Sequence, residues 1–397
     1  MALCGALPGR RAGSLAPRTE GLTIQDSDPS EAHATLFTPG PVPIPRHLLA
    51  LGNQQPPYSR TREFSQLTYS ILEGLGYIFQ TAGPVMLLTG SGTAAMETVV
   101  LNFLEDDDNA LVLNAGTFGQ RWCDLCTVHG LSHESLRLEA GEDLDLDSLA
   151  TALSNNVSIL FATAHETSTG ELFDLEAIGR LTRRLGILFV VDAISTVCAD
   201  HFLMDEWNID VAVLSSQKGL ALPPGLAFVA MGDRALDRLE NVQPRTLYFN
   251  VREYLNDQKR GQVPFTPATG LFLQLHQRLL DITDMTLERL IGQHQEKAHD
   301  FREALRALPI DTLPTRPSNA ITAVTCGDFD AYEVVQALRT DFGIEVAPNS
   351  GALKHRVFRV SHMGEHSPED STSLIRALAD ITARLSRPEK AATGGVS

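Results

Sequence analysis

The fold and the chemistry of this chain centre on one stretch, Ile209-Asp-Val-Ala-Val-Leu-Ser-Ser-Gln-Lys-Gly-Leu220, which is followed by Ala-Leu-Pro-Pro-Gly225. Its first residues are apolar and largely β-branched, and they predict a buried strand. The strand delivers Lys218 into a turn rich in glycine and proline, which holds the side chain in place. Burial can lower the pKa of such a lysine, and only the neutral amine attacks a carbonyl carbon. The stretch alone fits a reactive lysine and an ordinary loop lysine equally well.

Strands and helices alternate along the chain on the N-terminal side of this stretch. Short apolar runs predict strands over 85–88, 110–113, 157–162, 187–192 and 211–214. Helices are predicted over 63–80, 118–129 and 175–185, and another opens within 89–97 and continues to about 104. This alternation predicts an α/β domain whose mostly parallel sheet is covered on both faces. Ligands of such sheets bind at the carboxyl ends of the strands. Lys218 and the glycine-rich turns are expected at those ends.

The C-terminal part of the chain has a different pattern. A helical region over 270–308 is followed by strands and helices that predict a small α+β domain. We therefore expect five segments, which are a disordered extension (1–35), a large domain that includes the N-terminal segment (36–268), a connecting helical region (269–308), a small C-terminal α+β domain (309–388) and a flexible tail (389–397).

Composition excludes several classes of function. The formal net charge of −17 argues against a nucleic-acid or anionic-membrane partner, because the surface would repel phosphate. No apolar run approaches the roughly 20 residues that span a bilayer. Five cysteines in 397 residues make no disulfide framework and favour a reducing cytoplasm. Cys123 and Cys126 form a lone CxxC within a helical pattern, which predicts buried thiols and no metal site.

Four features share one chemical explanation. They are the Gly-Ser-Gly turn within 89–97 that opens a helix, Phe118 in a glycine-rich loop, Asp192 at the end of a strand, and Lys218. Pyridoxal 5′-phosphate would use all four, for its phosphate, its ring face, its pyridine nitrogen and its aldehyde. Asp192 by itself also fits a structural or magnesium-binding role. The chain lacks the GxxxxGK[ST] motif of phosphoryl transfer, and its Gly-Ser-Gly turn lacks the third glycine of a dinucleotide site.

The order of several motifs resembles the class V, fold type I aminotransferases that depend on pyridoxal phosphate. These motifs are Ser91-Gly-Thr-Ala-Ala-Met-Glu97, Asn114-Ala-Gly-Thr-Phe-Gly-Gln-Arg-Trp122, Glu166-Thr-Ser-Thr-Gly170, Val191-Asp-Ala-Ile-Ser195, Ser216-Gln-Lys-Gly219, Pro223-Pro-Gly225, Pro264-Phe-Thr-Pro267 and Phe358-Arg-Val-Ser-His-Met-Gly364. The resemblance covers about 36–385 and is greatest to the alanine–glyoxylate, serine–glyoxylate and serine–pyruvate branch. It implies a large cofactor-binding domain over 36–268 and a homodimer.

The resemblance also implies roles for individual residues. Lys218 would form the Schiff base and shuttle the proton, and Asp192 would keep the pyridine nitrogen protonated. Phe118 would stack on the ring, Thr167 would bond near its phenolic oxygen, and Arg359 would clamp the substrate carboxylate. The phosphate would be held by five residues, of which the last would come from the other subunit: Ser91, Gly92, Thr93, Gln217 and Thr266.

The departures from the family pattern lie on the substrate side. Ala164 replaces the usual histidine, while His165 stands one place later, and Ser361 and the stretch 348–351 also differ. His165 fits a role near the ring and a core or loop histidine equally well.

The sequence predicts a ping-pong transfer from alanine, serine or aspartate to glyoxylate or pyruvate. Its alternatives are a 2-aminoethylphosphonate–pyruvate transaminase, suggested by the stretches 60–64 and 245–250, and a non-catalytic scaffold that binds the cofactor. A cysteine desulfurase is disfavoured because Cys326 is expected in a strand and not in a mobile loop.

Overall fold

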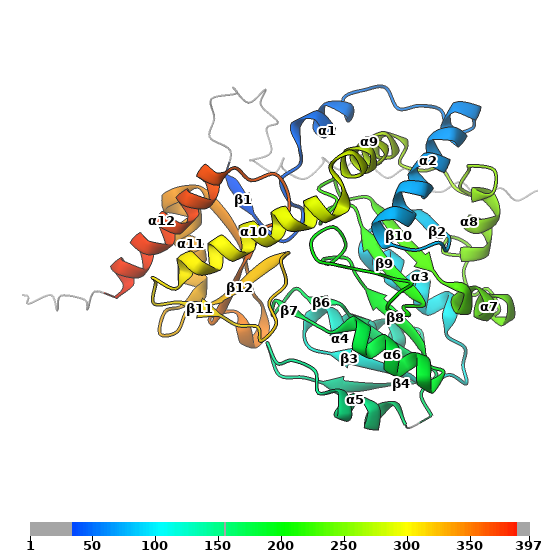
Figure 1. Ribbon diagram of the computed structural model, residues 1–397, viewed down its shortest axis with the longest axis horizontal. Helices are drawn as coiled ribbons and strands as arrows, with labels where there is room; N and C mark the ends of the chain where they lie inside the picture. The colour runs from blue at the N-terminus through cyan, green and yellow to red at the C-terminus, as the bar shows by residue number, and fades with distance from the viewer. Residues whose placement is uncertain (1–33, 155, 387–397) are drawn as a thin grey trace, which may run out of the picture. The chain divides into compact units, whose positions relative to one another are not determined.

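The computed structural model describes residues 34–154 and 156–386. The expected extension over 1–35 lies outside this part of the chain, except that Thr35 begins the first strand, β1 (Thr35–Phe37). The expected tail over 389–397 lies wholly outside it. Figure 1 shows the described chain from the N-terminal strand to the last helix, α12 (Pro368–Leu385).

A seven-stranded sheet forms the centre of the larger part of the fold. Its order is β2 (Val85–Thr89), β10 (Leu226–Met231), β9 (Val211–Ser215), β8 (Leu188–Asp192), β5 (Ile159–Thr163), β3 (Ala110–Asn114) and β4 (His133–Arg137). All neighbouring pairs are parallel except those that involve β10, which runs antiparallel to both β2 and β9. The mostly parallel α/β sheet predicted from the sequence is confirmed.

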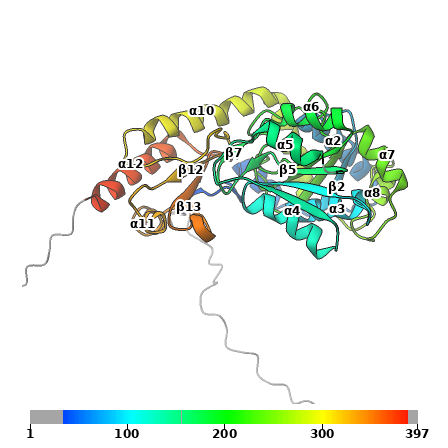
Figure 2. The ribbon, with the colours of Figure 1, turned by 90° about the horizontal axis from the view of Figure 1, so that it is seen from below.

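Helices cover both faces of this sheet (Figures 1 and 2). One core contains side chains of α3 (Gly92–Phe103), α4 (Thr117–Val128), α7 (Asp233–Asn241) and α8 (Val251–Gln258). The other contains side chains of α1 (Arg46–Leu51), α2 (Arg62–Phe79), α5 (Leu146–Leu153), α6 (Leu175–Leu185), α9 (Thr269–Met285) and α10 (Leu287–Leu305). Successive residues of β9 alternate between the two cores, since Ala212 lies in one and Val213 in the other. Burial on both faces explains why these strands read as continuous apolar runs.

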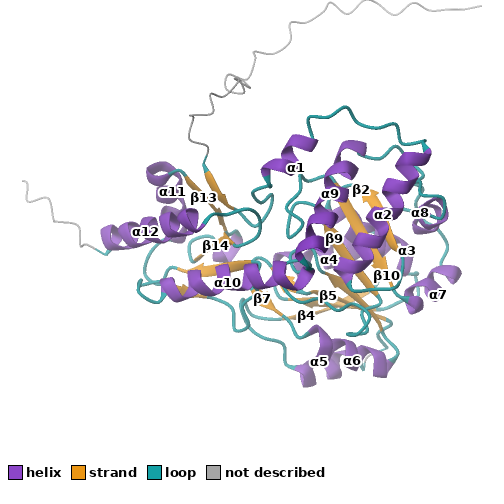
Figure 3. Ribbon diagram, turned by 45° about the horizontal axis from the view of Figure 1, so that its top comes forward, coloured by secondary structure: helices purple, strands orange, loops and turns teal. Residues whose placement is uncertain are grey.

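A second sheet forms the centre of the smaller part of the fold. In Figure 3 its strands β13 and β14 are at the left and the large sheet is at the right. Its five strands follow the order β1, β13 (Ile344–Pro348), β14 (Val357–Ser361), β12 (Ile321–Thr325) and β11 (Asp311–Thr312). The helices α11 (Ala331–Phe342) and α12 contribute to its core. The expectation that the N-terminal segment belongs with the large domain is wrong for β1, which pairs in parallel with β13. Local sequence does not encode this pairing, because the partner strand lies about 300 residues away.

The expected helical region over 270–308 consists of two helices. α9 and α10 are separated by Thr286, whose φ of 80° is incompatible with a continuous α-helix. The Thr286 hydroxyl accepts a hydrogen bond from the Arg289 amide and so caps α10. The break redirects the chain toward the smaller sheet, as Figure 1 shows.

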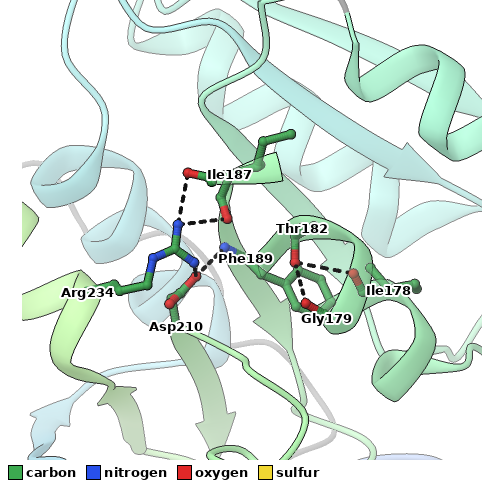
Figure 4. Close-up of polar contacts among 8 residues, drawn as sticks. Ile178, Gly179, Thr182, Ile187, Phe189, Asp210 and Arg234 are labelled. Carbon is green, nitrogen blue, oxygen red and sulfur yellow. Dashed lines mark hydrogen bonds and ion pairs between the residues drawn. The ribbon is translucent and has the colours of Figure 1, made fainter. Parts of the chain in front are cut away.

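An ion pair fixes the amino ends of β8 and β9, away from the edge where Lys218 lies. Asp210, which is buried, accepts hydrogen bonds from the Phe189 amide at 2.7 Å and from Arg234 at 3.0 Å (Figure 4). Arg234 also donates to the carbonyl oxygens of Gly186 and Ile187. These contacts join the start of β8 to the start of β9 and to α7.

We expect Asp210→Ala to lower the free energy of unfolding by about 3–5 kcal/mol, because it leaves Arg234 and the Phe189 amide without their buried acceptor. Chemical denaturation of the purified protein measures this change. The matched control, Asp237→Ala, removes an exposed carboxylate of α7 and should change stability by about 0.5 kcal/mol or less. Equal effects of the two substitutions would contradict a structural role for the Asp210 ion pair.

Candidate active site

The carboxyl edge of the large sheet gathers most of the residues predicted to form the site. Asp192 is the last residue of β8, and Lys218 follows β9 by three residues. The turn before α3 follows β2, and the turn before α4 follows β3. Arg359 comes from β14 of the second sheet and reaches the same region, where it donates a hydrogen bond at 3.4 Å to the Thr167 carbonyl oxygen.

The Lys218 loop is braced by its own backbone and by Ser216. The Ser216 hydroxyl donates to the Pro223 carbonyl oxygen at 2.7 Å and accepts from the Leu226 amide at 3.2 Å. The Ala221 amide donates to the Lys218 carbonyl oxygen at 2.8 Å. The loop is therefore held in one conformation, as the sequence predicts for a turn rich in glycine and proline.

The Lys218 side chain is 9% exposed, and its Nζ donates to the Pro39 carbonyl oxygen at 2.7 Å. A Cβ at Gly40 would lie 2.8 Å from this Nζ, so only glycine lets the segment pass so close to the lysine. Burial, and next the positive charge of Arg359, lower the pKa of Lys218 to about 8, against the opposing effect of Asp192. An appreciable fraction of the amine is therefore neutral near physiological pH.

Asp192 is buried, and its Oδ1 accepts one hydrogen bond, from the Ile194 amide at 2.9 Å. Burial raises the pKa of Asp192 to about 6, and the negative charge of Glu166 raises it as well. A cation placed beside this carboxylate would favour its ionised form. The site thus suits a ligand that carries a protonated ring nitrogen.

The turn before α3 suits an anion. α3 begins at Gly92, and no side chain caps its first turn. A Cβ at Gly92 would lie 2.5 Å from the Ile194 side chain and 3.2 Å from the Ser215 hydroxyl, so the backbone of the turn packs against the segments that follow β8 and end β9. Two buried side-chain oxygens at the end of β9 and just after it, Ser215 Oγ and Gln217 Oε1, have no hydrogen-bond partner among the described residues. Free amide groups at a helix start, with the Ser215 hydroxyl able to donate beside them, fit a phosphate group.

Arg121 was not singled out in the sequence, although it stands three residues after Phe118. Its guanidinium carbon lies 4.9 Å from the centroid of the Phe118 ring, and its Nη1 donates to the Thr93 hydroxyl at 3.2 Å. Arg121 thus joins the residue expected to stack on the cofactor to the turn expected to hold its phosphate. The signal available in the sequence was the i,i+3 spacing of Phe118 and Arg121 on one helix.

Glu166 is a second residue that sequence reasoning missed. It is fully buried, and its carboxylate accepts hydrogen bonds from the amides of Phe118 and Gly119 at 3.1 and 3.0 Å. These amides belong to the first turn of α4, where a negative charge is favourable. Its Oε1 also accepts from the Ser168 amide and hydroxyl. Glu166 therefore fixes the Phe118 helix against the loop that carries Thr167.

Thr167 is buried beside these residues. Its hydroxyl donates to the Ser195 hydroxyl at 2.9 Å, which places it next to the segment that follows Asp192. Thr266 has an exposed side chain, and no hydrogen bond of that side chain to a described residue is present. The segment that follows it nevertheless lies beside the end of β2, because the Ala268 amide donates to the Thr89 hydroxyl at 3.1 Å.

Arg359 lies on β14, which is flanked by β12 and β13. Arg359 therefore stands on an interior strand of the second sheet and not on its edge. Its Nη2 donates to the Pro348 carbonyl oxygen at 2.8 Å, while its buried Nε has no hydrogen-bond partner among the described residues. Asn349 follows on the same segment and donates to the Ser168 carbonyl oxygen at 2.7 Å. Arg359 is therefore held in place with hydrogen-bonding capacity left over.

His165 lies between these elements, on the short strand β6 (His165–Glu166), which pairs with β7 (Glu171–Leu172). It is buried, and neither ring nitrogen makes a hydrogen bond of normal geometry to a described residue. Burial is the main cause that lowers the pKa of His165 to about 3, and the positive charges of Lys218, Arg302 and Arg359 contribute to this lowering. His165 is thus a neutral imidazole in the region of Lys218 and Arg359.

The cysteines take no part in this site. Cys123 and Cys126 are buried free thiols on α4, as the sequence predicts. Cys326 is also buried and stands one residue beyond β12, so the expectation of a strand position is wrong by one residue. Within the described ranges, no group of three or more His, Cys, Asp or Glu residues could hold a metal ion. No helix in those ranges has the length and apolar character of a membrane span.

Comparison with known proteins defines the class. The family model of class V aminotransferases matches residues 56–362. The chain is 33% identical to the small subunit of a soluble hydrogenase from Synechococcus sp., over 89% of this chain and 94% of that protein. It is 30% identical to L-aspartate–glyoxylate aminotransferase from Paracoccus denitrificans, over 90% and 93% of the two chains. The crystal structure of alanine–glyoxylate aminotransferase from Nostoc sp. matches with a TM-score of 0.85 and 29% identity, covering 90% of this chain and 97% of that one.

The chain belongs to the class V aminotransferase family. It is accordingly an enzyme of fold type I that transfers amino groups with pyridoxal 5′-phosphate as its cofactor. The buried carboxylate of Asp192, the uncapped turn at Gly92 and the unpaired hydroxyl of Ser215 beside that turn fit that cofactor.

The pH at which Lys218 becomes neutral gives a prediction that needs no substrate. The rate at which the apoprotein takes up pyridoxal phosphate should rise with pH through about 8, because the neutral amine increases as pH passes the lowered pKa of Lys218. Arg359→Gln removes a positive charge that lowers this pKa, so the midpoint should move to higher pH. Stopped-flow absorbance between pH 6 and 10 measures both midpoints.

The control for this experiment is Arg316→Gln, which removes a partly exposed arginine that does not contribute to the pKa shift of Lys218. Its midpoint should equal that of the unmodified protein. A midpoint that stays fixed in Arg359→Gln would show that Arg359 and Lys218 do not interact.

Proposed function

We propose that the protein transfers the amino group of a small amino acid, such as alanine, serine or aspartate, to a small 2-oxo acid, glyoxylate or pyruvate. The observation that carries the proposal is the position of Arg359. Its guanidinium lies close enough to Lys218 to lower the pKa of the lysine, and it retains an unpaired buried Nε. A substrate carboxylate bound there would place its α-carbon near the amine of Lys218.

The roles of the residues follow from their contacts. Pyridoxal phosphate supplies an aldehyde that binds amines and a ring that withdraws electrons from the substrate α-carbon. The amides at Ser91, Gly92 and Thr93 and the side chain of Gln217 would bind its phosphate, with Arg121 adding positive charge through its bond to Thr93. Phe118 would cover the ring face, and Thr167 would bond near the phenolic oxygen.

Two residues would act on protons. Asp192 would hold the proton of the pyridine nitrogen, because a buried carboxylate with one hydrogen bond gains most from a cationic partner. Lys218 would take the proton from the substrate α-carbon in its neutral form and then return it. Glu166 would act indirectly, since its bonds to the amides of Phe118 and Gly119 fix the position of the stacking ring.

The choice of acceptor rests on the relatives. The Paracoccus and Nostoc proteins are named for glyoxylate, and both match about nine-tenths of this chain. The alternative of a 2-aminoethylphosphonate donor receives no support from the residues that suggested it. Arg60 donates to Gln262 and to the Val263 carbonyl oxygen, and Arg245 pairs with Asp106 at 2.8 Å. Both arginines already have hydrogen-bond or ion-pair partners. Neither is therefore an unpaired cation that could bind the phosphonate group of such a donor.

We propose a cytoplasmic homodimer as the working form. Thr266 is exposed, and the large side chains of Leu247 and Tyr248 are exposed as well. A second subunit covering this surface would bring Thr266 to the phosphate site of its partner. Sedimentation velocity of the protein, loaded with cofactor, should give a dimer, and Thr266→Ala should weaken cofactor binding without changing the association state.

The donor and acceptor are tested by two half-reactions. The cofactor-loaded protein should lose its absorbance in the visible region when a true donor is added, and it should regain it with a true acceptor. Alanine, serine, aspartate and 2-aminoethylphosphonate are compared as donors, followed by glyoxylate and pyruvate as acceptors. Bleaching by 2-aminoethylphosphonate alone would overturn the proposal in favour of the phosphonate enzyme. Bleaching by none of the four donors would overturn the proposed substrate class.

A further inference from the structure

A cavity of about 460 Å³, separate from the candidate active site, lies between α9, α10 and the loop that follows β14. It is lined by residues of these three elements together with α1 and the Lys218 loop, among them Arg278, Asp281, His294, Lys297 and Glu365. No residue assigned above to the cofactor or the substrate lines it. Its volume is within the range of sites that bind small molecules.

Arg278 is the most unusual residue of this cavity. It is buried, with 8% of its surface exposed, and its Nε donates to the Leu220 carbonyl oxygen at 2.9 Å. Its terminal nitrogens, Nη1 and Nη2, make no hydrogen bond within residues 34–154 and 156–386, and no carboxylate in these ranges forms an ion pair with it. These two nitrogens therefore present donors to the cavity that no described residue accepts.

Lys297 presents a second positive charge to the same cavity. It is half-buried, and its Nζ donates only to the Gly364 carbonyl oxygen at 3.2 Å. It forms no ion pair with any residue that the structure describes. His294, which also lines the cavity, adds no charge, since burial lowers its pKa to about 3 and the charges of Lys297 and Arg278 act in the same direction.

Two carboxylates line the cavity and act on these cations at longer range, Asp281 and Glu365 on Arg278 and Glu365 on Lys297, but neither forms an ion pair with them among the described residues. Asp281 accepts hydrogen bonds from His47 at 2.7 Å and from Gln277 at 2.8 Å. Glu365 is exposed to solvent. Neither lies within 4.0 Å of the nitrogens of Arg278 or Lys297. The cavity therefore contains two cations whose unused donors have no acceptor from the described protein.

We propose that this cavity binds a small carboxylate, which accepts hydrogen bonds from the Nη atoms of Arg278 and from Lys297. The planar fork of an arginine matches the two oxygens of a carboxylate, and the lysine adds a charge-assisted bond. The bound carboxylate would be linked to the active site on both sides. Arg278 holds the carbonyl of Leu220, two residues after Lys218, and Lys297 holds the carbonyl of Gly364, in the segment that follows Arg359.

The test uses malonate as the probe and thermal unfolding of the cofactor-loaded protein as the readout. Arg359→Gln serves as the parent, so that malonate cannot bind at the substrate clamp. The melting temperature of this parent should rise with malonate and then saturate, because a ligand that binds the folded state stabilises it. Lys297→Gln in the same background should weaken the apparent affinity about tenfold, the loss expected for one charge-assisted hydrogen bond.

Two further variants make the outcome specific to the cavity. Arg278→Gln should abolish the saturable rise in melting temperature. Lys259→Gln, which removes an exposed lysine beyond α8, should leave the rise unchanged. Equal malonate affinities in the parent and Lys297→Gln would overturn the proposal, as would a rise that never saturates.

Discussion

Lys218→Ala is expected to reduce the rate of amino transfer by about 10⁴-fold, the upper part of the range for loss of a positioned acid–base group. Lys218 is the one buried amine at the carboxyl end of β9, with its Nζ at 2.7 Å from the Pro39 carbonyl oxygen. Without it, the site lacks the neutral amine that would take the proton from the substrate α-carbon. Single-turnover measurements of donor-dependent bleaching should show this loss even at saturating donor.

The matched control is Lys218→Arg, which keeps the positive charge but cannot become neutral, because a guanidinium stays protonated throughout the working pH range. It should be as inactive as Lys218→Ala, although its charge beside Asp192 is retained. Lys218→Arg with half of the original rate would contradict a role for the neutral amine. Unchanged cofactor absorbance in Lys218→Ala would contradict the attachment of the cofactor to this residue.

Arg359→Gln is expected to raise KM for the 2-oxo acid about 100-fold, with a much smaller effect on the affinity for pyridoxal phosphate. The loss of a bidentate, charge-assisted pair with a carboxylate is about 3 kcal/mol, which corresponds to a factor of about 100. Steady-state kinetics with glyoxylate and pyruvate give KM, and absorbance titration of the apoprotein gives the cofactor affinity.

Arg359→Lys separates the charge from the fork. It should recover only part of the lost affinity, because an ammonium makes a point contact where the guanidinium makes two parallel bonds. Full recovery in Arg359→Lys would reduce the role of Arg359 to simple charge attraction. A KM that stays within twofold in Arg359→Gln would remove the clamp from the proposed function.

Much of the large domain could be predicted from the sequence because its signals are local. The runs that became β8 and β9 are apolar at every position, since both faces of each strand are covered by helices. β10 was not predicted, although Leu226–Met231 is as apolar as the runs of β8 and β9; its direction, antiparallel to β2 and β9, has no local signal. The assignment of Lys218, Asp192 and Phe118 to one edge followed from the rule that the carboxyl ends of parallel strands lie together.

The supporting contacts could not be predicted in the same way, because they join segments that are distant in the chain. Pro39 lies 179 residues before Lys218, and its carbonyl accepts the lysine's hydrogen bond. The link between Glu166 and the start of α4 spans 48 residues. No sequence pattern specifies which backbone amides a glutamate will meet.

The sequence by itself determined the alternation of strands and helices, the turn that presents Lys218 and the set of residues that a pyridoxal phosphate enzyme requires. These depend on local patterns of burial and on residue chemistry. Only the tertiary structure decided that Arg359 stands on a central strand close to Lys218, that β1 belongs to the second sheet, and that Arg278 and Lys297 share a cavity without an ion-pair partner among the described residues. Each depends on packing between distant segments, and it is this packing that sets the burial and the electric field around each charge.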